Sequence, residues 1–534
     1  MSRMVRPSRT DRRGARGSAP VRPPARSLPA GLRGAAFAWW FLALITVAGA
    51  AVRFAALRYQ PMVTGDGTEY VWIADALRHG HGFASVFPPG YPLLIALAHL
   101  VIPDRVGAAV AVAMLAGIAL PAIVWGLARG ALGDRGALLP ALFCALHLEL
   151  ARHSAITMSE SPYIAALYLG LAALASASRW PRAAAGGFAL GCAFAIRPEA
   201  LAAILALASA GVFAISRRRR DVRPVIAAAV ACLLVVFACV LWYRQTLGVW
   251  TLTPKIGALH EVAHDWRTFE PRVGQTVGQP GPLSARLAAS VRAWPANAAM
   301  HAEALLWSWP WPLSALAIWG LARRRGIETA ALLYLLLMPF LGLTQQGRFA
   351  LEAIPALAIA ASVPMVRERR RWLRHAAVAI AVFGQVACCW ALSDAFRTPF
   401  EGGKVTDRLA GRWLAQASRP GDVVVDRKPF VAFYADRPRR VLPEGTRDEL
   451  LDTMVRTHAR WFVLQEYVAR QMRPGLAPLL DSASVRERET RIELAYARAD
   501  ASDGSLAIFR VLQPGEKKSG APPVVEVAGF PGRP

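Results

Sequence analysis

Cysteine is rare in this sequence, and its placement excludes two common ways of building a small domain. The chain has six cysteines in 534 residues, and no two of them form a Cys-x-x-Cys pair. Spacing of this kind fits neither a disulfide framework nor a cysteine-based zinc site. We therefore expect buried thiols that act as small hydrophobic side chains, and all six lie in apolar runs: Cys144, Cys192, Cys232, Cys239, Cys388 and Cys389.

Acidic residues are also few, with 36 Asp and Glu against 62 Lys and Arg, which gives a formal net charge of +26. A charge of this size first suggests a nucleic-acid partner. However, the arginines stand in short clusters between apolar segments, and neither a basic helix nor an aromatic platform accompanies them. Such clusters are typical of the loops that orient membrane helices. We expect no nucleic-acid partner.

Long hydrophobic runs are what the sequence does contain, with 55% hydrophobic residues. Crossing about 30 Å of hydrocarbon takes roughly 20 helical residues, and several runs reach that length. The first run lacks a small-residue cleavage site, so we interpret it as a retained anchor. The pattern predicts a mainly α-helical, multi-pass protein of the lipid bilayer with about 11 spans, near residues 37–57, 107–128, 136–152, 160–177, 183–196, 199–216, 224–243, 301–322, 327–343, 348–366 and 375–393.

The basic clusters alternate along these spans, as the positive-inside rule requires. If every second loop faces inward, the inward loops contain all of the clusters, at 129–135, 179–182, 217–223, 323–325 and 367–374. This alternation places the N-terminus in the cytoplasm and residues from about 395 outside, in what we expect to be a bacterial inner membrane. Two long outside loops follow, at 58–106 and 244–300.

The remaining composition divides the chain into four parts. Residues 1–33 are rich in Arg, Pro and Gly and are predicted to form a disordered cytoplasmic tail. The multi-spanning domain covers 34–394, and a small extracytoplasmic α/β domain covers 395–513. In that domain we expect strands at 423–425, 461–464 and 506–509 and a helix at 447–458. Residues 514–534 are predicted to be a disordered tail.

Several charged residues fall on the outer side by this topology. Asp66 and Glu69 lie in the first outside loop, on a predicted short helix at 66–79 that precedes an interfacial helix at 91–101. Glu160 begins a span, and Arg197 lies in the turn after a short span of fourteen residues, so it needs anionic partners or a water-filled cavity. Two further outside cations are Lys255 and Arg348.

These charges suit group transfer from an anionic lipid. A carboxylate can take the proton of an attacking hydroxyl, and we name Asp66, Glu69 and Glu160 as catalytic candidates. Cations can hold a departing phosphate, and Arg197, Lys255 and Arg348 are the candidates for that role.

Structural explanations remain open for most of these residues. Glu69 can serve as a solvated charge of its loop helix, and Glu160 as a helix-start charge favoured by the macrodipole. Arg197 can pair with Glu199 or Glu160, and the other two cations can be ordinary interfacial residues. An anion-binding cavity is also compatible with a transporter that performs no chemistry.

One motif points to a different chemistry. His260-Glu261-Val262-Ala263-His264 matches the H-E-x-x-H signature, in which two histidines on one helical face bind zinc. A zinc metalloprotease is therefore a third hypothesis, with Glu303 as a conceivable third ligand. An incidental metal site explains the motif equally well, so His260 and His264 are weak metal candidates.

The order of the outer-face motifs resembles a known family. Asp66 with Tyr70, followed by Pro88-Pro89-Gly90-Tyr91-Pro92, is similar to the first loop of GT-C fold membrane glycosyltransferases. The resemblance is to the dolichyl-phosphate-mannose protein mannosyltransferase and aminoarabinose transferase superfamily and to bacterial Rgt-type transferases. The Arg197-Pro198-Glu199 turn and the Thr253-Pro254-Lys255 stretch look like later landmarks of the same family.

The resemblance implies sugar transfer from a polyprenyl-phosphate sugar donor to a lipid, glycan or protein acceptor, with Asp66 as base. It implies inverting chemistry without an obligatory nucleotide sugar or other cofactor, and it leaves a divalent metal open. Two departures are visible. The family's adjacent Asp-Glu pair is here Asp66-Gly67, and the lysine that the aminoarabinose type carries before Pro88-Pro89 is absent.

Overall fold

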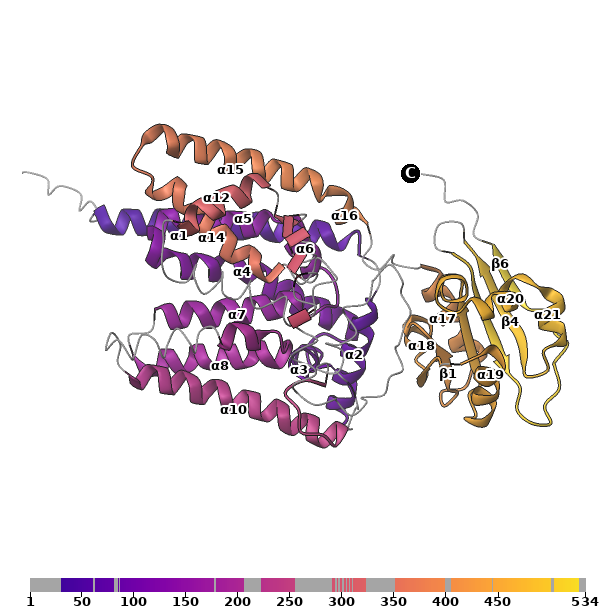
Figure 1. Cartoon of the computed structure of the whole chain (residues 1–534). Coiled ribbons are helices and arrows are strands. Elements are labelled where there is room, and N and C mark those ends of the chain that lie inside the picture. The colour runs from indigo at the N-terminus through magenta and orange to yellow at the C-terminus, as the bar shows by residue number, and fades with distance from the viewer. Residues whose placement is uncertain are drawn as a thin grey trace, which may run out of the picture.

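The computed structural model describes residues 30–60, 63–80, 85, 87–176, 179–205, 222–254, 311–322, 351–398, 405–443, 445–500 and 504–527, with scattered residues between 291 and 309. Figure 1 shows a bundle of helices on one side and a mixed sheet with its own helices on the other. The predicted combination of a mainly helical domain and a small C-terminal α/β domain is therefore confirmed.

The bundle is built from apolar helices whose bounds follow the hydrophobic runs. Four of them are long and apolar enough to cross a membrane, namely Ala36–Leu57, Arg105–Gly136, Val222–Leu247 and Arg371–Ala391. The described helices are α1 (Ala30–Leu57), α4 (Arg105–Gly136), α5 (Leu138–Leu146), α6 (Leu148–Ser154), α7 (Glu160–Ala175), α8 (Trp180–Ile196), α10 (Val222–Leu247), α12 (Trp311–Ala322), α14 (Ile354–Arg367) and α15 (Arg371–Ala391). The number of spans stays a prediction, because 206–221 and 323–350 lie outside the described residues.

Several predicted spans differ in their bounds. The first begins at Ala30, so the disorder predicted for residues 1–33 is wrong for residues 30–33, which form the start of α1. The second continues past residue 128 to Gly136, with a non-helical residue at Gly133, where φ is 74°. The third is two short helices, α5 and α6, which are separated at His147. The fifth begins at Trp180 and has 17 residues, so it is longer than the fourteen expected.

The helices form one continuous apolar core. Helix α8 packs between α7 and α10, α4 contacts α1, α5 and α7, and α12 contacts α14 and α15. The prediction of buried thiols is confirmed for four cysteines, Cys144, Cys232, Cys239 and Cys388, whereas Cys192 and Cys389 are partly exposed; all six are free.

Helix ends that the arginine alternation assigned to the same side lie together. The Arg135 guanidinium at the end of α4 stacks over the Phe37 ring near the start of α1, 5.2 Å from its centroid. Arg367 at the end of α14 donates to the Ala131 carbonyl of α4. At the opposite end of the bundle lie α2 (Gly65–Arg78) and α3 (Gly90–Ala98), and this end faces the sheet domain (Figure 1).

The C-terminal domain is a six-stranded sheet in the order β2-β1-β3-β5-β4-β6. Strands β1 (Val424–Asp426), β2 (Arg439–Val441) and β3 (Trp461–Gln465) are parallel, whereas β5 (Leu506–Val511) is antiparallel to both β3 and β4 (Ile492–Ala499). The chain reaches this sheet through α15, α16 (Ser393–Arg397) and α17 (Val405–Ala417). Helix α18 (Phe430–Ala435) follows β1, and α19 (Arg447–Arg456) lies between β2 and β3.

Three strands and one helix of this domain were expected from the sequence and are present. The disorder predicted from residue 514 is wrong for part of that segment, because β6 (Val524–Val527) pairs in parallel with β4. A strand of only four residues, which pairs through its backbone, gives little sequence signal among the surrounding Pro, Gly and Lys residues.

Arg53 donates hydrogen bonds to backbone carbonyls that the break between α5 and α6 leaves without helical donors. A helix end leaves carbonyls without intrahelical donors, and such groups are costly away from water. The Arg53 side chain of α1 is fully buried and donates to the Ala145 carbonyl at 3.0 Å and to the Cys144 carbonyl at 3.3 Å. The buried arginine therefore takes the place of the missing helical turn.

Two glycines allow the outer helices to approach the bundle closely. A Cβ at Gly67, in the first turn of α2, would lie 2.0 Å from the Thr157 Oγ1 atom. A Cβ at Gly90, the first residue of α3, would lie 2.5 Å from the Ala195 carbonyl carbon near the end of α8. Both helices are thus held against the ends of bundle helices at positions where no side chain fits.

We predict that Arg53→Met destabilises the bundle by about 2–5 kcal/mol, because it leaves the α5 carbonyls buried without donors. The local readout is maleimide labelling of the buried Cys144, which should become much faster than in the wild type. Arg58→Gln, at an exposed arginine one turn further along the chain, is the control. Equal labelling in both variants would show that Arg53 does not support the α5 end.

We further predict that Gly67→Ala displaces the start of α2, because its methyl group would overlap Thr157. Hydrogen exchange of peptides from α2 should accelerate, while Gly126→Ala in α4, where nothing lies within 4 Å of the added Cβ, should leave it unchanged. If α2 exchanges alike in both variants, the close approach at Gly67 is not what fixes the helix.

Candidate active site

Asp66 lies in the first turn of α2, at the end of the bundle that faces the sheet domain. The helix begins there because the Thr64 side chain caps it by accepting a hydrogen bond from the Gly67 amide at 3.0 Å. Thr64 is in turn tied to Thr157, which accepts from the Thr64 amide at 3.0 Å through its Oγ1 atom. Asp66 is partly exposed.

Gly67 explains the first departure from the family pattern. The second acid of the family's Asp-Glu pair would have no room here, because a side chain at position 67 would overlap Thr157. The absence of the adjacent Glu therefore follows from the close packing of α2 on the loop between α6 and α7. Glycine at position 67 instead lets the backbone of α2 pack directly against Thr157.

Tyr70, one turn after Asp66, links α2 to the start of α7. Its hydroxyl shares a hydrogen bond with the Ser159 hydroxyl at 3.0 Å, and its ring packs edge-on against Phe87 and Tyr91, each with centroids 5.0 Å away. Burial raises the pKa of Tyr70, the charge of Asp66 raises it further, and Arg197 opposes the shift. Charges from three segments thus act on one hydroxyl.

One of the predicted acids, Glu160, forms a buried cluster with the predicted cation Arg197 and with Glu199. Arg197, the residue after α8, donates to Glu160 at 2.6 Å and to Glu199 at 3.0 Å, and its guanidinium stacks over Tyr163 at 5.7 Å. All three charged groups are nearly inaccessible to solvent. The expectation that Arg197 needs anionic partners is confirmed, and the pairing proposed as its structural explanation is formed.

A residue that the sequence reasoning missed belongs to this cluster. Glu352 is buried at 4% exposure, and its charge also acts on Arg197. The signal was present, because Glu352 is an acid inside an apolar run, which is rare in membrane segments and usually functional. The cluster then contains one cation against three carboxylates.

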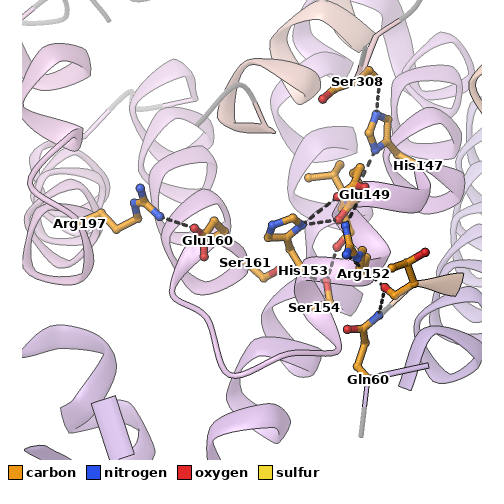
Figure 2. A network of polar contacts seen from close by, with 12 residues as sticks. Gln60, His147, Glu149, Arg152, His153, Ser154, Glu160, Ser161, Arg197 and Ser308 are labelled. Carbon is orange, nitrogen blue, oxygen red and sulfur yellow. Dashed lines mark hydrogen bonds and ion pairs between the residues drawn. The ribbon is translucent and has the colours of Figure 1, made fainter. Parts of the chain in front are cut away.

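Polar contacts continue from this cluster across the bundle (Figure 2). Ser161, next to Glu160, shares a hydrogen bond with Ser154 at 3.1 Å, and Glu149 on α6 forms ion pairs with Arg152 and His153, each at 3.3 Å. These residues were not predicted to matter. The available signal was the presence of polar side chains in nearly every turn of a short stretch between apolar spans.

Glu69 is bound by the other domain. The Arg439 side chain of β2 reaches Glu69 at 3.3 Å and Asp426 of β1 at 2.6 Å. Burial raises the pKa of Glu69, Arg439 opposes the shift, and Asp66 adds to it. Glu69 is thus part of the contact between the domains as well as a neighbour of the candidate base.

Four sequence candidates lie outside the described residues. Lys255 and Arg348 were predicted to hold a donor phosphate, and His260 and His264 were weak metal candidates. Their roles stay predictions. Within the described part of the chain, two partly exposed carboxylates, Asp66 and Glu69, lie on the same helix as Tyr70, whose hydroxyl is also influenced by the buried Arg197 cluster. A carboxylate placed in this way can accept a proton from a hydroxyl group bound at this end of the bundle.

Comparison with known families agrees with this geometry. The sequence model of the family described as dolichyl-phosphate-mannose-protein mannosyltransferase matches residues 87–243, which include Tyr91, Glu160, Arg197 and Glu199. No curated protein sequence matches the chain significantly.

Solved structures match over most of the chain. ArnT from Cupriavidus metallidurans bound to undecaprenyl phosphate is 14% identical, with a TM-score of 0.55 over 88% of this chain and 97% of that one. Archaeal oligosaccharyltransferase AglB from Archaeoglobus fulgidus, in complex with an inhibitory peptide and a dolichol-phosphate, is 13% identical, with a TM-score of 0.56 over 90% and 75%. The resemblance stated from the sequence is therefore confirmed, and the chain has the fold of the GT-C glycosyltransferases.

Proposed function

We propose that this protein is a membrane glycosyltransferase that moves a sugar from a polyprenyl-phosphate donor to a hydroxyl acceptor on the extracytoplasmic face. The position of Asp66 carries the proposal. It is a partly exposed carboxylate, held by a capped helix start, at the end of the bundle that faces the soluble domain. Relatives in fold bind undecaprenyl phosphate and dolichol-phosphate, which supports a lipid-phosphate donor.

In the proposed reaction Asp66 is the general base. The acceptor hydroxyl gives its proton to Asp66 while its oxygen bonds to the anomeric carbon of the sugar. The bond between that carbon and the phosphate oxygen breaks, and the lipid phosphate leaves with the electron pair. Attack from the side opposite the phosphate inverts the anomeric centre. No cofactor is required, and the acceptor can be a lipid, a glycan or a protein.

The departing phosphate needs cations, and Lys255 and Arg348 are the proposed ones. Arg197 contributes less positive potential than its charge suggests, because Glu160 and Glu199 both pair with it. We propose that Arg197 chiefly holds Glu160 in a fixed, ionised position near Tyr70. A buried ion pair broken on one side typically costs 3–5 kcal/mol, so this cluster should also be important for folding.

We predict that Asp66→Asn lowers kcat for sugar transfer at least about 100-fold, because the amide cannot accept the proton of the acceptor. The variant should insert, fold and bind the lipid donor as the wild type does. Transfer is measured with purified protein in liposomes that contain a radiolabelled polyprenyl-phosphate sugar and acceptor.

Asp104→Asn is the matched control, since Asp104 caps α4 in the same outside loop and Asn caps helices equally well. It should leave transfer unchanged. Undiminished transfer by Asp66→Asn would remove Asp66 from the mechanism. Movement of substrate across the liposome membrane without a glycosylated product would favour the transporter hypothesis instead.

A further inference from the structure

Helix α2 carries most of the contacts between the bundle and the soluble domain, which is the C-terminal domain of the sheet. Glu69 pairs with Arg439 and Trp72 packs on Phe433, so these two neighbours on the helix surface both meet the soluble domain. Asp75 binds Arg105 of the bundle, which also reaches that domain. Asp66 lies about one turn before Glu69, so the first of these contacts is close along the helix to the candidate base.

Arg439 makes the first of these contacts. It bridges Glu69 of α2, at 3.3 Å, and Asp426 of the sheet, at 2.6 Å, and it also donates to the Arg427 carbonyl at 3.1 Å. The Asp426 side chain is fully buried and that of Arg439 is 12% exposed. Removing one partner of an ion pair shielded in this way leaves an uncompensated buried charge, which costs far more than breaking a pair on the surface.

Arg105 makes the second contact, near Trp72 and Asp75 of α2. Its guanidinium pairs with Asp75 of α2 and with Asp436 at the end of α18, each at 3.1 Å, and it lies over the Phe433 ring at 4.8 Å. The same ring packs edge-on against Trp72 at 5.6 Å. Charge pairing and aromatic packing thus join α2 to α18.

The third contact reaches the residue before the α2 cap. Tyr434 of α18 accepts a hydrogen bond from the Val63 amide at 3.2 Å. The Thr398 carbonyl after α16 accepts from Gln60 at 3.2 Å and from Arg152 at 3.1 Å, which anchors the chain where it leaves the bundle. The soluble domain is thereby attached at its entrance, just before the α2 cap, and at Glu69 and Trp72 of α2.

We propose that the soluble domain positions the catalytic carboxylate, and that Arg439 is the positioning residue that locks α2 in place through Glu69. This inference rests on the proposed function, in which Asp66 is the base. Burial raises the pKa of Asp426 to about 7, with Arg439 acting against the shift. Displacement of a catalytic group by about 1 Å can cost roughly 100-fold in rate.

The test compares Arg439→Gln with Arg440→Gln, a matched control on the next residue of the same strand, whose side chain is exposed. Arg439→Gln should lower kcat about 10- to 100-fold and leave the KM for the lipid donor within about twofold, because it moves the base without removing a donor contact. Arg439→Lys should recover part of the loss. An unchanged kcat in Arg439→Gln overturns the proposal.

A double-mutant cycle separates positioning from a chemical role of Glu69. If Glu69 acts only through Arg439, Glu69→Gln combined with Arg439→Gln should be no slower than Arg439→Gln alone. Multiplied losses in the double variant would overturn the proposal. Glu69→Gln keeps the Arg439–Asp426 pair, so it remains informative if Arg439→Gln unfolds the sheet domain.

Hydrogen exchange of α2 peptides gives a readout that does not need activity. Exchange should accelerate in Arg439→Gln and in Glu69→Gln but not in Arg440→Gln. Equal exchange in all three variants overturns the proposal that Arg439 holds α2 in place. If the wild type transfers no sugar, the proposed function fails, and the catalytic part of this inference fails with it. The exchange result then still decides whether Arg439 holds α2.

Discussion

The pair of hydrogen bonds between Thr64 and Thr157 is the constraint on which the candidate site depends. The Thr64 amide donates to the Thr157 side chain at 3.0 Å, and the Thr64 hydroxyl donates to the Thr157 carbonyl at 3.1 Å. Thr64 also caps α2, so the start of that helix is fixed to the loop before α7. This junction fixes the beginning of α2, next to Asp66, and the contacts with the soluble domain further along the helix hold the remainder.

Buried arginines hold the surrounding elements together, each in its own way. Arg53 supplies donors to carbonyls at a helix break, whereas Arg197 compensates the carboxylates of Glu160 and Glu199. Arg439 does the same between the domains, with Glu69 and Asp426. A buried charge is tolerated only with such partners, and removing one partner leaves the other at high cost. Paired charges therefore tie together the segments at the end of the bundle where the chemistry is proposed to occur.

The sequence predicted much of the fold because its signals were local. Apolar runs marked the helices, and arginine clusters grouped helix ends that do lie together, as Arg135 and Arg367 do. Breaks and short pairings were missed, since nothing local distinguishes the interruption at His147 from a continuous span or reveals β6 in a tail rich in Pro and Gly. At the site, the sequence found Asp66, Glu160 and Arg197, but not that Glu69 is bound by Arg439, 370 residues away. Contacts of that kind depend on tertiary packing, which no sequence period encodes.

The central claim is that Asp66 faces the bound donor from a helix fixed between two domains. The most direct measurement is a cryo-electron microscopy structure of the protein with a non-hydrolysable polyprenyl-phosphate sugar. The account predicts the sugar next to Asp66, with its anomeric carbon accessible to a hydroxyl that the carboxylate can reach, and α2 still attached to Arg439. A donor bound at the opposite end of the bundle, or with Asp66 turned away from the sugar, would contradict it.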